Sequence, residues 1–147
     1  MEAMGASATR HSSPAAEAWG LMFELIHLSK RRFMAIASEF ELAPAQLMAL
    51  KALDPDDPVP MRDLAEALAC DNSNVTGIID RLEDRGLVER RPSAADRRVK
   101  MLVVTEAGID VRRRVKDRME EAPEPLKRLT ADEQVLLRDL MRKALAG

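Results

Sequence analysis

Cysteine and histidine are nearly absent from this 147-residue sequence, which contains one cysteine, Cys70, and two histidines. A single cysteine excludes an intrachain disulfide, and so few thiols and imidazoles exclude a Cys/His zinc cluster. The sequence also has no phosphate-cradling glycine loop, no HExxH motif and no nucleophile with an evident histidine partner. We therefore expect no structural metal, no cofactor and no enzymatic activity.

Long apolar runs are also missing, since none approaches the roughly 20 residues that span a bilayer. The opening residues, MEAMGASATRHSSP, have neither the basic start nor the apolar stretch of a secretory signal. We expect a cytoplasmic protein without membrane contact. Residues 1–13 are small and polar without periodicity, and we expect a disordered tail there.

Aromatic residues make up only 3% of the chain, whereas 46% of the residues are hydrophobic, so the core should be aliphatic and helical. The net charge of −2 excludes a surface coated with positive charge. Any nucleic-acid site must then be a local patch. Residues 81–100 contain such a patch, with seven positive residues against four negative ones.

Four helices are predicted in the first part of the chain. Ser13 and Pro14 begin a long helix that runs to about residue 40, and Pro44 begins a second that the prolines of DPDDPVP end. A short third helix follows. Asp71 caps a fourth helix, which Gly86 ends in a left-handed conformation. The short third and fourth helices form a helix-turn-helix candidate.

A β-hairpin, or wing, is predicted directly after these helices, from residue 87 to residue 104. Thr105 then caps a fifth helix, and Thr130 with Glu133 forms a capping box for a sixth. The predicted fold class is mainly α, with an α+β wing: a winged helix-turn-helix between N- and C-terminal helices that form a dimerisation domain.

Three regions follow from this element order. Residues 43–105 are the predicted winged helix-turn-helix DNA-binding domain, and residues 14–42 with 106–147 are the predicted helical dimerisation region. The first and last helices carry more apolar surface than a small winged core can cover. We therefore expect a homodimer with two-fold symmetry.

The start of the fourth helix has short polar side chains that suit base edges in a major groove. Asn74 has the amide group that pairs with adenine, and Gly77 permits close backbone approach. The same residues also suit simple capping and solvation of a helix. The predicted DNA-binding residues of this helix are Asn72, Ser73, Asn74, Thr76, Gly77 and Arg81.

The predicted wing supplies the positive charge that the fourth helix lacks. Arg97 and Arg98 lie beside the hairpin tip, where an arginine can enter a narrow minor groove, and Asp96 lies close enough to orient one guanidinium. Lys100 is predicted to bind phosphate. The alternative for such a charge run is a solvated face.

The segment from Asp96 to Thr105, DRRVKMLVVT, resembles the wing motif of MarR-family regulators, Asp-x-Arg followed by five residues and Leu-Thr, with Val104 in place of leucine. Residues 81–88, RLEDRGLV, resemble the end of that family's recognition helix. The resemblance implies a homodimeric transcriptional repressor on a pseudo-palindromic operator of double-stranded DNA. It also implies Arg98 as the minor-groove residue, steadied by Asp96.

Family members are often released from DNA by a small aromatic or phenolic effector. Trp19, Phe23 and His27 follow each other at four-residue spacing and suit such a ligand, although a stripe of this kind is more often core or interface. Cys70 precedes the fourth helix, so a redox sensor is a second possibility beside a buried, inert thiol. A third is a winged-helix adaptor that binds protein without specific DNA binding.

Overall fold

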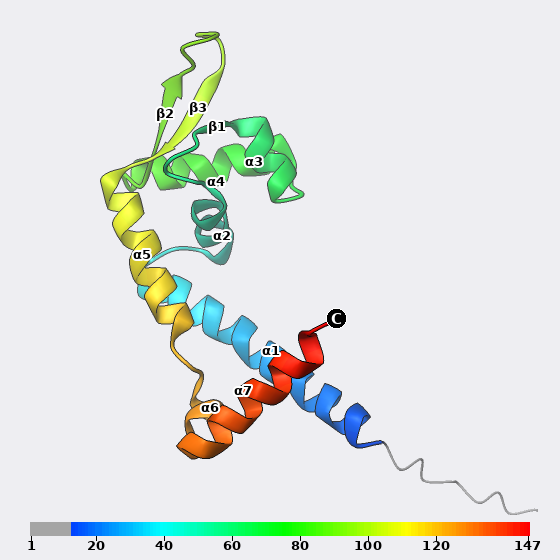
Figure 1. Ribbon diagram of the computed structural model, residues 1–147. Coiled ribbons are helices and arrows are strands. Elements are labelled where there is room, and N and C mark those ends of the chain that lie inside the picture. Colours follow the sequence, from blue (N-terminus) through cyan, green and yellow to red (C-terminus); the bar gives the residue numbers. More distant parts are fainter. Residues whose placement is uncertain (1–12) are drawn as a thin grey trace, which may run out of the picture. The chain divides into compact units, whose positions relative to one another are not determined.

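The computed structural model describes residues 13–147, so residues 1–12 of the predicted disordered tail lie outside the described part, as does the side chain of Asn72 (Figure 1). The chain divides into two units, residues 1–32 and 33–147. The elements are α1 (Pro14–Glu39), α2 (Pro44–Ala52), β1 (Val59–Pro60), α3 (Met61–Ala67), α4 (Asn72–Asp84), β2 (Val88–Pro92), β3 (Lys100–Val104), α5 (Glu106–Glu120), α6 (Glu124–Lys127) and α7 (Ala131–Leu145). None of the described helices is long and apolar enough to cross a membrane.

The predicted helix starts are confirmed where a side chain caps them. The Ser13 hydroxyl accepts a hydrogen bond from the Ala16 N–H at 3.2 Å at the start of α1. The Thr105 hydroxyl accepts from the Gly108 N–H at 3.1 Å at the start of α5. Thr130 and Glu133 form the predicted capping box of α7. Each of these caps satisfies a backbone N–H that has no partner within its helix.

Asp71 differs from the prediction at the start of α4. Its backbone is extended and its carbonyl accepts from the Val75 N–H at 3.1 Å, but its side chain makes no cap hydrogen bond. The other end of α4 agrees with the sequence, since Gly86 has a φ of +70° just after the last turn. Glycine fits there because it has no Cβ to clash in the left-handed region.

One aliphatic core holds the second unit together. Helices α2, α3 and α4 each bury one face in it, and β3 covers it from the hairpin side. Burying each leucine contributes about 1.5 to 3 kcal/mol, so this core supplies much of the folding free energy. Its largest fully buried side chains are Ile36, Leu47, Leu50, Leu53, Leu64, Val75, Ile79, Leu82, Val88, Leu102 and Val115.

The wing is a three-stranded antiparallel sheet in the order β1-β3-β2. Strands β2 and β3 pair from Val88 with Val104 to Pro92 with Lys100, and they form the hairpin that extends beyond α3 and α4 in Figure 1. The sequence analysis missed β1, where Val59 pairs with Leu102. The missed strand has two residues, and its proline is tolerated because an edge strand needs no donor on its outer side.

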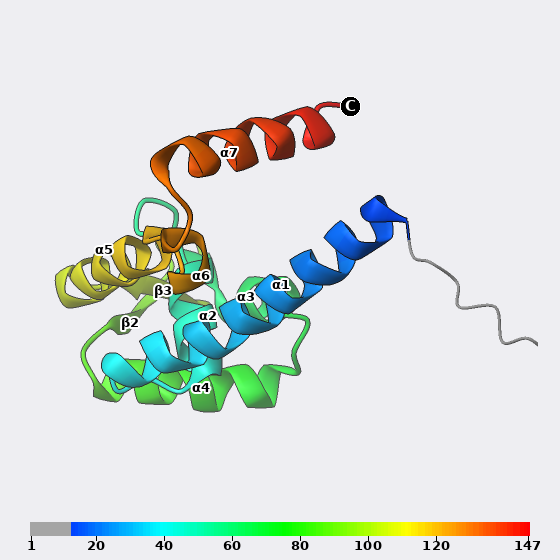
Figure 2. The ribbon, with the colours of Figure 1, turned by 90° about the horizontal axis from the view of Figure 1, so that it is seen from below.

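Helices α6 and α7 follow the winged core. The predicted break at Pro123 contains one extra helical turn, α6, because Pro125 lies in its first turn, where a missing N–H costs nothing. Helix α7 extends away from α5 and from the winged core (Figure 2). Its side chains Val135, Leu136, Leu140 and Leu145 are exposed in the single chain.

Candidate nucleic-acid interface

The first turns of α4 present polar side chains to solvent. Ser73 and Asn74 are exposed, whereas Val75 and Ile79 are fully buried on the opposite face. A Cβ at Gly77 would meet no atom within 4 Å, so the backbone there is open to close approach. Helix α4 thus has an apolar inner face and a short polar outer face.

Thr76 faces a different surface, a cavity of about 420 Å³ that β1, α3 and the hairpin line. The structure brings Thr76 and Lys100 together there and adds Arg62, which the sequence analysis did not consider. The only signal in the sequence for Arg62 was its position, as a basic residue at the start of the third predicted helix. The cavity is lined by Pro60, Met61, Arg62, Thr76, Arg90, Val99 and Lys100.

Arg81 lies in the last turn of α4, about 12 Å along the helix axis from Ser73. It continues the four-residue spacing of Ser73 and Gly77, so all three share one stripe. Arg81 is exposed, and no ion pair joins it to a carboxylate in the described part of the chain. The structure thus places Arg81 on the polar stripe but not beside the first turn.

Arg98 lies in the loop that joins β2 to β3, close to the start of β3. One carboxylate oxygen of Asp96, Oδ1, accepts from the Arg98 backbone N–H at 3.0 Å and from its Nε at 3.3 Å. The Arg98 side chain is nevertheless 92% exposed. It therefore projects into solvent while its backbone N–H and Nε are held by Asp96. The predicted contact between Asp96 and Arg98 is confirmed. Arg97 and Lys100 are exposed and form no ion pair with the carboxylates of residues 13–147.

Two of the three carboxylates in the C-terminal half of α4 pair with one arginine of the hairpin. Arg90 Nη2 lies 2.5 Å from Asp80 Oδ1, and Arg90 Nη1 lies 2.9 Å from Glu83 Oε1. The hydrogen bond with Asp80 raises the pKa of Arg90 above its ordinary value, and Glu83 adds to the shift. Asp80 and Glu83, which would otherwise repel phosphate, therefore face a cation of the hairpin.

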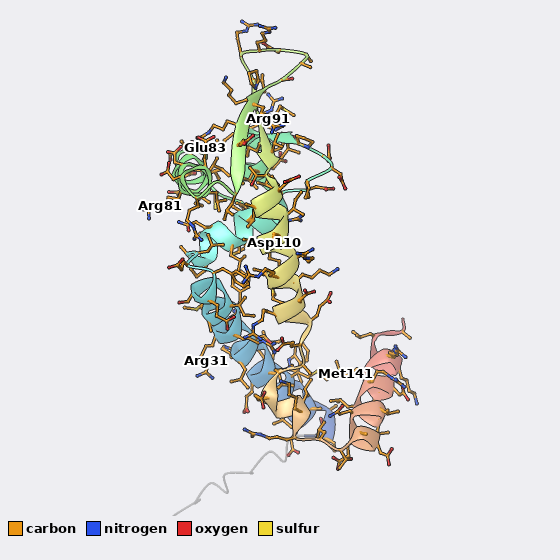
Figure 3. The ribbon with its side chains drawn as sticks, turned by 90° about the vertical axis from the view of Figure 1, so that its left-hand side faces the viewer. Arg31, Arg81, Glu83, Arg91, Asp110 and Met141 are labelled. Atoms are coloured by element: carbon orange, nitrogen blue, oxygen red, sulfur yellow. The ribbon has the colours of Figure 1, made fainter. Side chains whose placement is uncertain are left out.

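Two other arginines of this region are bound within the protein. Arg91 pairs with Glu89 on the same strand, at 2.7 Å, and Arg85 donates to the carbonyl oxygens of Phe40 and Glu41. Figure 3 labels Arg81 and Glu83 on α4 and Arg91 on the hairpin. The positive charge left for a ligand is consequently concentrated at the hairpin tip, near Arg97, and along the open stripe of α4.

The predicted effector residues lie together on α1. The rings of Trp19 and Phe23 meet edge to face, with centroids 4.9 Å apart. His27 Nδ1 lies 2.8 Å from the Phe23 carbonyl oxygen. Because a carbonyl only accepts, Nδ1 is the donor of this hydrogen bond. Cys70 is exposed rather than buried, and its thiol donates to the Leu68 carbonyl at 3.3 Å.

A second cavity, of about 510 Å³, lies between α2 and α5. Lys51 Nζ donates to Met119 Sδ at 3.4 Å, and Arg112 Nη2 donates to the Lys51 carbonyl at 3.3 Å. Arg112 Nε is buried without a hydrogen-bond partner among the described residues. The sequence analysis missed this site, which is lined by Lys51, Ile109, Arg112, Arg113, Lys116, Met119 and Glu120.

Comparison with known proteins agrees with this geometry. Residues 42–100 match the family model of the MarR family. The chain is 30% identical over 95 residues to YfiV of Bacillus subtilis, described as an uncharacterized HTH-type transcriptional regulator, which covers 65% of this chain and 59% of YfiV. It is 34% identical over 76 residues to the HTH-type transcriptional repressor NicR of Pseudomonas putida, over 52% of this chain and 48% of NicR.

The chain therefore spans about half the length of the curated relatives it matches. The likeness to solved structures is longer. The crystal structure of YusO from Bacillus subtilis is 25% identical and superimposes with a TM-score of 0.74, covering 92% of this chain and all of YusO. The winged core of the chain thus matches the MarR family, and the likeness of fold to YusO extends over most of the chain.

Proposed function

We propose that the chain is a sequence-specific DNA-binding transcriptional regulator that acts as a repressor on a pseudo-palindromic operator. The observation that carries this proposal is the pairing of an exposed polar start of α4 with a hairpin whose tip projects Arg98. A helix of this kind fits a major groove and an arginine of this kind fits a minor groove. The similarity to YfiV and NicR, both described as HTH-type transcriptional regulators or repressors, supports the same function.

The proposal includes a homodimer, and the apolar side chains that a single chain leaves exposed support it. On α1, Trp19 is 58% exposed, and on α7, Leu136 is 59% and Leu140 is 55% exposed. Exposed apolar side chains that gather on a helix mark an interaction surface, and each of these two helices has them. A second copy related by a two-fold axis would cover it and would present two recognition helices to two half-sites.

Release by a small aromatic or phenolic effector is the regulatory part of the proposal. Trp19, Phe23 and His27 remain its predicted contacts. The cavity between α2 and α5 is a second candidate binding site for this effector. Its cations suit a carboxylate or phenolate, while Ile109 and Met119 suit an apolar ring.

The test begins with selection of a preferred duplex from a random DNA library by the full chain. Binding to that duplex should weaken steeply with salt, because each bound phosphate releases counterions. It should also fall with both Arg97→Ala and Arg98→Ala. Affinity that neither substitution changes, or no selection of any duplex, would contradict the proposal and favour a winged-helix adaptor that binds protein.

A further inference from the structure

We propose that Arg90 is a positioning residue that locks α4 to the β2–β3 hairpin, so that the two DNA-reading elements keep one mutual orientation. This inference rests on the proposed function. It assigns Arg90 no contact with DNA. Its role is to fix where the exposed start of α4 lies relative to Arg98 at the hairpin tip.

The contacts of Arg90 join two elements through both its side chain and its backbone. Asp80 and Glu83 are three residues apart on α4 and so lie on one face, turned toward β2. The guanidinium binds both carboxylates, and the Arg90 backbone N–H donates to the second oxygen of Glu83 at 3.0 Å. The Arg90 side chain is only 22% exposed, whereas Asp80 is 56% and Glu83 is 40% exposed, so the guanidinium is held against the protein while both carboxylates reach solvent.

The same end of α4 is also held from its other side. Arg85, the C-cap residue, donates to the Phe40 carbonyl at 3.0 Å and to the Glu41 carbonyl, in the turn that follows α1. At the opposite end, the Asp71 side chain makes no cap hydrogen bond. The burial of Val75 and Ile79 packs α4 against the core along its length, and these polar contacts add a second restraint in its C-terminal half.

This arrangement matters because a tilt of α4 about these polar contacts moves the first turn most. Asp80 lies about 9 Å along the axis from Asn74. A major-groove helix and a minor-groove hairpin must match the groove spacing together, so a fixed angle lowers the cost of ordering them on DNA. Selectivity depends on that match more than bulk phosphate attraction does.

The test compares Arg90→Gln with Arg91→Gln, two substitutions on one strand that remove the same charge. Arg91 pairs with Glu89 on its own strand and not with α4, which makes it the matched control. The measurement is the ratio of affinities for the selected duplex and a mixed-sequence duplex. We expect Arg90→Gln to lower that ratio about tenfold, the loss of roughly one base contact, while Arg91→Gln stays within about twofold of wild type.

Two further variants separate positioning from charge and from folding. Arg90→Lys keeps the charge but cannot bridge two carboxylates with a planar fork, so its selectivity should fall between those of Arg90→Gln and wild type. If Arg90→Gln does not fold, Glu83→Gln takes its place, because Glu83 receives two of the three hydrogen bonds. Equal selectivity for Arg90→Gln and Arg91→Gln would overturn the proposal.

Hydrogen exchange of the protein without DNA tests the lock independently of the proposed function. Arg90→Gln, or Glu83→Gln in its place, should speed exchange of amides in the last turn of α4 and in β2, and Arg91→Gln should not. If wild type selects no duplex, the proposed function fails and the exchange result still decides whether the lock exists. Unchanged hydrogen exchange in Arg90→Gln, or in Glu83→Gln in its place, would refute the lock.

Discussion

Gly108, in the first turn of α5, packs directly against the carbonyl oxygen of Leu87. A Cβ at Gly108 would lie 2.1 Å from that oxygen and 2.7 Å from Val104 Cγ1. The close approach is fixed by Thr105, whose backbone N–H donates to the Leu87 carbonyl at 3.1 Å and whose hydroxyl donates to the Gly86 carbonyl at 2.6 Å. The junction between the hairpin and α5 therefore has no room for a side chain.

Gly108→Ala should accordingly lower the free energy of unfolding by about 2 to 4 kcal/mol, since backbone must move to admit the methyl group. Urea denaturation measures the effect. Gly77→Ala is the matched control, because a Cβ there meets nothing and alanine favours a helix interior. That variant should raise stability by up to about 1 kcal/mol. A Gly108→Ala protein as stable as wild type would show that the junction is loose.

Arg98→Ala should weaken binding to the selected duplex more than Asp96→Ala, because Arg98 makes the proposed minor-groove contact and Asp96 only restrains it. We expect losses of about 1 to 3 kcal/mol for Arg98→Ala and less than about 1 kcal/mol for Asp96→Ala. Fluorescence anisotropy measures DNA binding by the two single variants and the double variant, and together these affinities give the coupling free energy between Asp96 and Arg98. A double variant much weaker than Arg98→Ala alone would indicate that Asp96 acts on DNA by another route.

Asn74→Ala and Lys100→Ala should affect DNA binding in different ways, the first through sequence preference and the second through overall affinity. Asn74→Ala should relax preference at one base pair by about 1 to 3 kcal/mol, because an amide reads a base edge. Lys100→Ala should weaken all duplexes alike and lower the salt dependence by about one phosphate contact. Titrations over a panel of single-base operator variants separate the two. Uniform weakening by Asn74→Ala would remove it from the base-reading set.

Leu140→Gln should weaken the proposed dimer, because a polar amide replaces an apolar side chain that a partner would bury. Each leucine contributes about 1.5 to 3 kcal/mol and a symmetric dimer contains two, so dissociation should be favoured by about 3 kcal/mol or more. Sedimentation equilibrium measures it. Arg142→Gln, also on α7 but turned by about 200° from Leu140, should leave association unchanged. Equal effects of the two would argue against α7 as the interface.

Lys51→Gln should reduce binding of benzoate or salicylate, probes with a ring and a carboxylate, if the cavity between α2 and α5 holds the effector. Lys51 Nζ lies 5.6 Å from the centre of the Phe33 ring and contacts Met119, so its charge is held at the cavity wall. Calorimetry should show weaker binding for Lys51→Gln and not for Lys143→Gln, on α7. A matching loss with Phe23→Ala instead would locate the ligand at the aromatic residues of α1.

Local features were the most predictable from sequence. Ser13, Thr105 and Thr130 begin helices because their hydroxyls accept from nearby N–H groups, and Gly86 ends α4 because it adopts a positive φ. The Asp96–Arg98 contact, two residues apart, belongs to the same class. Each depends on residues within one turn, so the order of amino acids is sufficient to predict it.

Features that join distant residues came only from the tertiary structure. The amino-acid sequence determined the helix order, the hairpin and the wing motif. It did not reveal that Val59 and Pro60 form a third strand, because two residues have no periodicity of their own. Nor did it show that Arg90 pairs with Asp80 and Glu83 of α4 or that Lys51 and Arg112 meet at one cavity. Such contacts depend on how the elements pack around the common core, and the spacing of residues along the chain does not predict that packing.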